Sequence, residues 1–206
     1  MHRLILAAAL LLAGTAHAAD LSITVKTTAG APVKDAVVMF TPAGGASTAG
    51  AKFDQPLRMA QKNIAFDPFV LITPVGSDVN FPNFDAVRHH VYSFSPAKKF
   101  ELKLYGKDES RSVHFDKAGV VAVGCNIHDQ MSGFIRVVDT PFAARTNEAG
   151  LAVVHGAPAG SGILKVWQPY LKAPGNEVAR PVQVGATGLK DSFSLEFRGA
   201  AGAHAM

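Results

Sequence analysis

The stretch GVVAVGCNIHDQMSG, residues 119–133, joins a strand-like run to the single cysteine of the chain. Val121, Val123 and Cys125 alternate with smaller residues, which is the period-two pattern of a half-buried β-strand. The loop that follows carries a histidine three residues after the cysteine and a methionine three residues after that. The sequence therefore predicts a strand that ends in a compact group of thiol, imidazole and thioether side chains.

The N-terminal segment MHRLILAAALLLAGTAHAAD has the features of a cleaved signal peptide. A basic start precedes an apolar run from Leu4 to Leu12, and small residues flank His17 in an A-x-A pattern. The apolar run is too short to span a bilayer permanently. We expect residues 1–18 to be removed and the mature protein to be periplasmic or secreted, without a membrane span.

The composition excludes several classes of protein. Removal of 18 of the 206 residues leaves 188, and the loss of Arg3 leaves 19 of the 20 basic residues against 16 acidic ones, a formal charge of +3. This small, unclustered excess predicts neither nucleic-acid binding nor attachment to an anionic membrane. One cysteine excludes an internal disulfide framework. The fold must therefore be stabilised by packing.

Short runs rich in Val, Ile, Phe and Tyr recur along the chain and are separated by Gly, Pro and Asn. Such runs are typical of strands in a β-sandwich, and the pattern contains no convincing long helix. The sequence predicts an all-β fold with two sandwiches. The tail at 199–206 is low in complexity and is expected to be disordered.

Two segments far apart in the chain resemble the opening and closing strands of carboxypeptidase regulatory-like, immunoglobulin-type domains. They are VKTTAGAPVKDAVVMF, residues 25–40, and ARTNEAGLAVVHGAPAGSGILKVW, residues 144–167. The resemblance implies a discontinuous, small immunoglobulin-like sandwich made of roughly 19–45 and 142–198. A second β domain would then be inserted between its two halves.

The lone cysteine raises a chemical question, because a free thiol in an oxidising compartment undergoes exchange and oxidation. One interpretation is a buried apolar side chain. A bound soft metal is another, since Cys125, His128 and Met131 place three donor groups in one loop. Sulfur ligands select copper, and two histidines, a cysteine and a weak axial methionine form the ligand set of blue-copper sites.

Two other chemistries fit the loop less well. A structural zinc site would favour more thiolates or histidines and no thioether. A nucleophilic site made of Cys125, His128 and Asp129 is disfavoured, because such groups normally converge from distant parts of a chain and face an oxyanion-stabilising pocket. The methionine favours copper.

The region from about 57 to 138 resembles the cupredoxins, a family that includes amicyanin, plastocyanin and the cupredoxin-like proteins of methylamine utilisation. The residues that carry the resemblance occur in the family's order: Phe66, Pro68, Gly76, Val79, Asn83, Asp85, His89, Cys125, His128 and Met131. It implies a Greek-key β-sandwich. It also implies one type 1 copper ion per chain, held by His89, Cys125 and His128 with Met131 as the weak axial ligand.

The upstream ligand is either His89 or His90. The family has an asparagine directly after this ligand, and the register H-H-V-Y-S-F aligns His89 with the ligand and His90 with the asparagine. We therefore favour His89. In the family the asparagine ties the ligand loops together, so His90 would have to take over that role.

The resemblance implies a blue copper protein that carries single electrons between a donor and an acceptor, both redox proteins of the periplasm, and that is not an enzyme. The alternative is a non-redox module that binds or delivers copper and uses its second β domain for interaction with a protein or the cell envelope. The predicted organisation comprises a signal peptide (1–18), N-terminal strands and linker (19–54), a cupredoxin domain (55–138), C-terminal immunoglobulin-like strands (139–198) and a tail (199–206).

Overall fold

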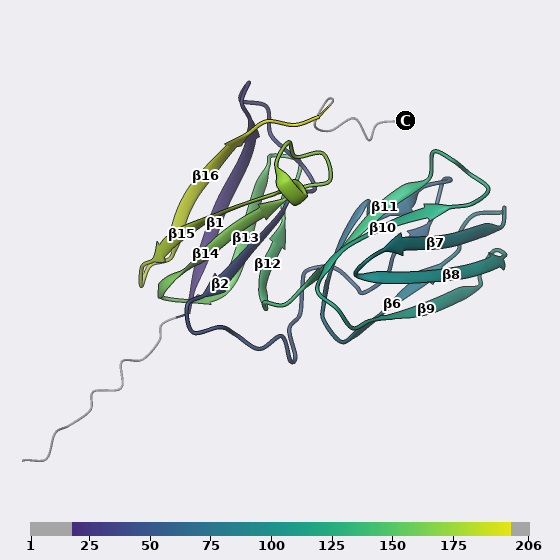
Figure 1. The fold of residues 1–206 in the computed structure, drawn as a ribbon, viewed down its shortest axis with the longest axis horizontal. Helices are drawn as coiled ribbons and strands as arrows, with labels where there is room; N and C mark the ends of the chain where they lie inside the picture. The colour runs from purple at the N-terminus through teal and green to yellow at the C-terminus, as the bar shows by residue number, and fades with distance from the viewer. Residues whose placement is uncertain (1–17, 199–206) are drawn as a thin grey trace, which may run out of the picture.

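The computed structural model describes residues 18–198, which form sixteen strands and one short 3-10 turn, Pro174–Asn176. The predicted all-β class is confirmed. The strands build two β-sandwiches that lie side by side (Figure 1). The predicted signal peptide, apart from Ala18, and the predicted tail lie outside the described residues. Within the described range, no helix is long and apolar enough to cross a membrane.

Strands from both ends of the chain form one sandwich, which we call the terminal sandwich. One of its sheets has the order β13-β1-β16 and the other β12-β2-β14-β15. Leu21, Ile23 and Val25 alternate along the first strand and are fully buried, as the period of two requires. The strands are β1 (Ala18–Thr27), β2 (Val37–Pro42), β12 (Phe142–Arg145), β13 (Leu151–Pro158), β14 (Gly160–Trp167), β15 (Glu177–Val184) and β16 (Leu189–Leu195).

The segment between them forms the middle sandwich. Its large sheet has the order β5-β11-β10-β7-β8 and faces the pair β6-β9, while β3-β4 form a small hairpin. Val121, Val123 and Cys125 of β10 are buried on its inner face, as the sequence predicts. The strands are β3 (Ala60–Gln61), β4 (Phe66–Asp67), β5 (Val70–Pro74), β6 (Ser77–Pro82), β7 (His89–Ser95), β8 (Lys98–Tyr105), β9 (Ser110–Phe115), β10 (Gly119–Cys125) and β11 (Ser132–Val138).

Strand pairing shows how the chain closes on itself. The first strand, β1, runs antiparallel to β13 and parallel to the last strand, β16. Residues 18–42 and 142–195 therefore share one sandwich. The predicted domain boundaries near 55 and 138 stay a proposal.

An apolar cluster joins the two sandwiches. Val37, Met39 and Trp167 of the terminal sandwich are buried together with Val70 and Ile72 of the middle one. The rings of Phe134 and Trp167 meet edge to face at a centroid distance of 6.0 Å. An ion pair between Arg136 and Glu177, 2.5 Å apart, crosses the same boundary. The terminal sandwich thus covers the outer face of β5 and β11.

Candidate metal centre

Three of the predicted ligands converge where β7 begins and β10 ends. Their donor atoms all lie within 4.8 Å of one another: the sulfur of Cys125 and one ring nitrogen each from His89 and His128. The Cys125 Sγ is 3.7 Å from His89 Nδ1 and 3.5 Å from His128 Nδ1. His89 and Cys125 are buried, whereas His128 is partly exposed. The loop histidine is therefore the most exposed of the three.

Backbone hydrogen bonds shape the loop that carries two of these groups. The Met131 amide donates to the His128 carbonyl at 2.9 Å, and the Cys125 amide donates to the Met131 carbonyl at 3.3 Å. The Asn126 amide donates to the His90 carbonyl at 2.9 Å, which ties this loop to the start of β7. The six residues after Cys125 thus form a closed turn that returns directly into β11.

Successive side chains of a strand point to opposite faces of the sheet, so the adjacent histidines of β7 lie on different faces. His89 is fully buried on the inner face, next to Cys125. His90 lies on the outer face, where its Nε2 is 2.8 Å from Oε1 of Glu101. The structure places His89, and not His90, in the donor cluster. The hydrogen bond between the two loops is accepted by the His90 backbone carbonyl. The His90 side chain contacts Glu101 instead.

Met131 lies at the end of the same loop. Its side chain is 2% exposed and belongs to the apolar core of the middle sandwich, as does that of Cys125. Its backbone hydrogen bonds to Cys125 and His128 keep it next to the cluster. Its role as an axial ligand stays a prediction.

A carboxylate completes the surroundings of His89, and the sequence analysis did not assign it a role. Asp85 Oδ2 is 2.9 Å from His89 Nε2. The same carboxylate accepts hydrogen bonds from the backbone amides of Asn63 at 2.6 Å and Ile64 at 3.0 Å. Burial would raise the pKa of Asp85, but the hydrogen bonds from Ile64, His89 and Asn63 outweigh burial and hold that pKa below its usual value.

This geometry fits a soft metal ion. Because the Asp85 carboxylate can only accept, His89 carries its proton on Nε2, and its Nδ1 lone pair is left to face the thiol. One sulfur and two imidazole nitrogens around one point are the donor set of a trigonal copper–thiolate site. The residues that would hold copper are thus His89, Cys125 and His128.

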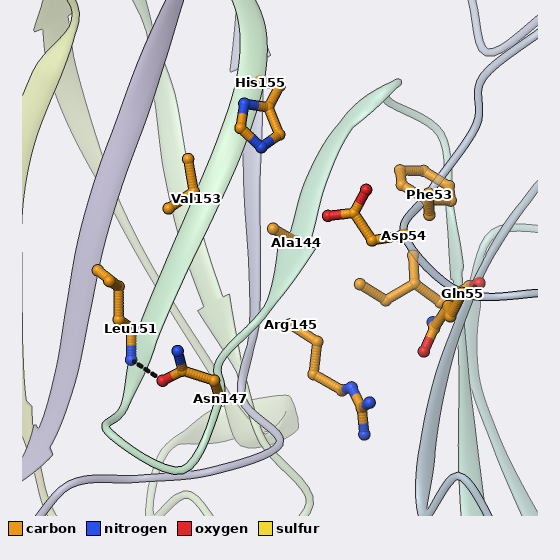
Figure 2. A pocket seen from close by; sticks show the side chains of 10 residues that line it. Phe53, Asp54, Gln55, Ala144, Arg145, Asn147, Leu151, Val153 and His155 are labelled. Carbon is orange, nitrogen blue, oxygen red and sulfur yellow. Dashed lines mark hydrogen bonds between the residues drawn. The ribbon is translucent and has the colours of Figure 1, made fainter.

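A hollow lies between the two sandwiches, away from these ligands. It has a volume of about 350 Å³, and Figure 2 shows Phe53, Asp54 and Gln55 on one side of it and β12 and β13 on the other. Two of its side chains already have partners: Arg145 pairs with Asp35 at 2.6 Å, and the His155 ring contacts Asp20 at 3.0 Å. Neither Arg145 nor His155 is therefore free to bind a ligand in the hollow.

No protein-family model and no curated protein sequence matches the chain. Solved structures do resemble it. They include a purple cupredoxin from Nitrosopumilus maritimus (22% identity, 39% of this chain, 98% of that one, TM-score 0.36) and a reduced amicyanin variant (22% identity, 49% and 98%, TM-score 0.37). A copper-containing nitrite reductase from Thermus scotoductus SA-01 is 29% identical over 41% of this chain (TM-score 0.39), but the match spans only 22% of the reductase.

The middle sandwich is cupredoxin-like. Its two facing sheets carry the His, Cys, His cluster where β7 begins and β10 ends, in the positions that the sequence resemblance predicts. The resemblance of the terminal sandwich to carboxypeptidase regulatory-like domains stays a prediction.

Proposed function

We propose that this protein is an exported type 1 (blue) copper protein that carries single electrons between periplasmic redox proteins. The observation that supports the proposal is the convergence of the Cys125 sulfur with nitrogens of His89 and His128 within 4.8 Å. This donor set is the one that blue-copper electron-transfer sites use. One copper ion per chain follows from one such cluster in the part of the chain that the structure describes.

Bound copper would supply one-electron exchange between Cu(I) and Cu(II). Cys125, as a thiolate, would share charge with the metal, and His89, His128 and the more weakly binding Met131 would be the other residues that hold it. His89 begins β7 and Cys125 ends β10, and both are buried, so these two ligands would keep their positions in either oxidation state. With four protein groups around the metal, no position is left for a substrate, which favours a carrier over an enzyme.

The loops around the cluster provide a surface on which a redox partner can dock. Phe84, Val87 and Ile127 are between 43% and 48% exposed on the loops that precede His89 and contain His128. Weak electron-transfer encounters use small interfaces of this kind. We propose His128 as the exit for the electron. Asp129 and Gln130 are exposed on the same loop, so the partner would meet a more polar surface than in amicyanin.

The visible spectrum of the copper-loaded protein tests this function. We expect an intense thiolate-to-Cu(II) band, one copper per chain and reversible one-electron reduction. A fully loaded protein without that band would refute the blue-copper proposal. Transfer of copper to a chelator that is faster than reduction would favour the alternative of copper delivery.

A further inference from the structure

His89 is fully buried, and its partner Asp85 is held by further hydrogen bonds. The His89 side chain is 0% exposed and that of Asp85 is 12% exposed, and their Nε2 and Oδ2 atoms are 2.9 Å apart. A carboxylate at this distance fixes the ring tautomer and makes the imidazole a stronger donor toward a metal. Asp85 thus acts on the ligand from the side opposite the thiol.

The β3–β4 hairpin supports the carboxylate. Its turn is closed by reciprocal backbone hydrogen bonds between Lys62 and Ala65, of 3.0 and 3.2 Å. Between them, Asn63 and Ile64 both adopt left-handed backbone conformations, with φ of 57° and 56°. A β-branched residue rarely adopts this conformation, and the Ile64 side chain is 41% exposed, so burial of that side chain does not explain it. Two consecutive residues with positive φ form the type I′ turn of a two-residue hairpin, and in this turn both amides donate to Asp85.

A buried amide fixes the backbone on the other side. Asn83 is 0% exposed, and its Oδ1 accepts a hydrogen bond from the Asp85 amide at 2.8 Å. Its Nδ2 donates to the carbonyls of Val87 at 2.8 Å and Tyr105 at 3.3 Å. These hydrogen bonds hold the loop from Asn83 to His89 in place.

We propose that Asp85 is a positioning residue that holds His89 as a metal ligand and lowers the reduction potential of the bound copper. The proposal rests on the proposed function. A negatively charged acceptor on Nε2 increases the electron density of the imidazole, which favours Cu(II) over Cu(I). A neutral acceptor at the same place would leave the geometry intact and give a higher potential.

The chain contains a matched control one residue away. His90 Nε2 is 2.8 Å from Glu101 Oε1, a distance within 0.1 Å of that between His89 and Asp85. This second pair lies on the outer face of the sheet, and its histidine is not in the donor cluster. Removal of the Glu101 charge therefore reports the effect of a neighbouring negative charge without a change at a ligand.

The test compares Asp85→Asn and Glu101→Gln in the copper-loaded protein. In Asp85→Asn the amide oxygen can keep the bonds to His89 and Ile64, and only the bond from Asn63 is lost. We expect a raised reduction potential, an altered visible band and Cu(II) binding weaker by about tenfold or more. Glu101→Gln should change none of these appreciably. Equal shifts in both variants, or no shift in Asp85→Asn, would overturn the proposal.

A measurement on the unsubstituted protein covers the case in which Asp85→Asn does not fold. In the metal-free protein, ¹⁵N NMR of the histidine rings should show His89 with its proton on Nε2, and a proton on Nδ1 would overturn the assignment. The two proposals fail in different ways. A copper-loaded protein without a blue band refutes the electron-carrier function. A blue protein whose reduction potential is unchanged by Asp85→Asn refutes only the role of Asp85.

Discussion

The core of the terminal sandwich consists of aliphatic and aromatic side chains, whereas the core of the middle sandwich ends in a thiol, an imidazole and a thioether. Both cores are built from strands that alternate inward and outward residues. Both sandwiches also bury polar side chains, but those of the terminal sandwich, Asp35, Thr140, Thr146 and Gln168, include no thiol and no imidazole. In the middle sandwich, His89 and Asn83 are both 0% exposed, and each has hydrogen-bond partners.

This difference indicates which sandwich carries chemistry. Burial of a polar group is costly unless partners satisfy it, so a sequence retains such groups where they serve a purpose. Asn83 and Asp85 do so by fixing the position of His89. The terminal sandwich packs its apolar cluster against the outer face of β5 and β11 and so supports the middle one.

The largest effect is expected for Cys125→Ser, which removes the only thiol. The copper-loaded variant should lose the strong visible band, because that band arises from the thiolate, and it should bind copper more weakly. Absorption spectra and copper content measure both. Far-UV circular dichroism of the metal-free forms serves as the control for folding. A variant that keeps the band would show that the middle core does not differ from the terminal one in the way proposed.

The next comparison uses the two faces of β7. His89→Ala removes a member of the donor cluster and should lower copper affinity at least tenfold, while His90→Ala should retain copper, since its side chain contacts Glu101 instead. Copper retained per chain after dialysis against a weak chelator measures the difference. If His90→Ala loses copper and His89→Ala does not, the register chosen for the upstream ligand is wrong.

The sequence predicts most of the fold, because strand patterns depend on local alternation. Val121, Val123 and Cys125 share a buried face as expected, and the loop after them closes as its spacing suggests. The pairing of β1 with β16 depends on contacts between residues about 170 positions apart, and periodicity alone cannot specify it. A resemblance of short turns suggested that arrangement, but no pattern within either segment requires it.

The sequence predicts the three donor groups that converge at the site, but not the residues that hold them in position. The spacing of His128 behind Cys125 indicates a shared loop, and the family register, in which an asparagine follows the ligand, favours His89 over His90. The contact of Asp85 with the β3–β4 hairpin could not be read in the same way, because it joins residues 21 and 22 positions apart through backbone amides. The available signals were the place of Asp85 in the family's order of residues and its four-residue spacing from His89.

A cavity in the terminal core should separate stability from chemistry. Leu164 is fully buried there, and Leu164→Ala is expected to lower the free energy of unfolding by about 2–5 kcal/mol. The visible band should stay unchanged. Val123→Ala, two residues before Cys125 in β10, is the counterpart in the middle core and should alter the band as well as stability. Denaturant titration and absorption spectra measure the two quantities, and a changed band in Leu164→Ala would mean that the two cores are not independent.

The smallest change is expected for Met131→Leu. This residue lies between the apolar core of the middle sandwich and the donor cluster. Leucine has nearly the same volume, so the free energy of unfolding should change by less than about 1.5 kcal/mol. An axial thioether binds weakly, and His89, Cys125 and His128 should therefore still hold copper. Their site becomes more apolar and nearly trigonal, which Cu(I) tolerates better than Cu(II), so the reduction potential should rise. Voltammetry measures that rise. If only thermal stability changes while spectrum and potential stay the same, Met131 is a core residue like Leu164, and another group must be the fourth neighbour of the metal.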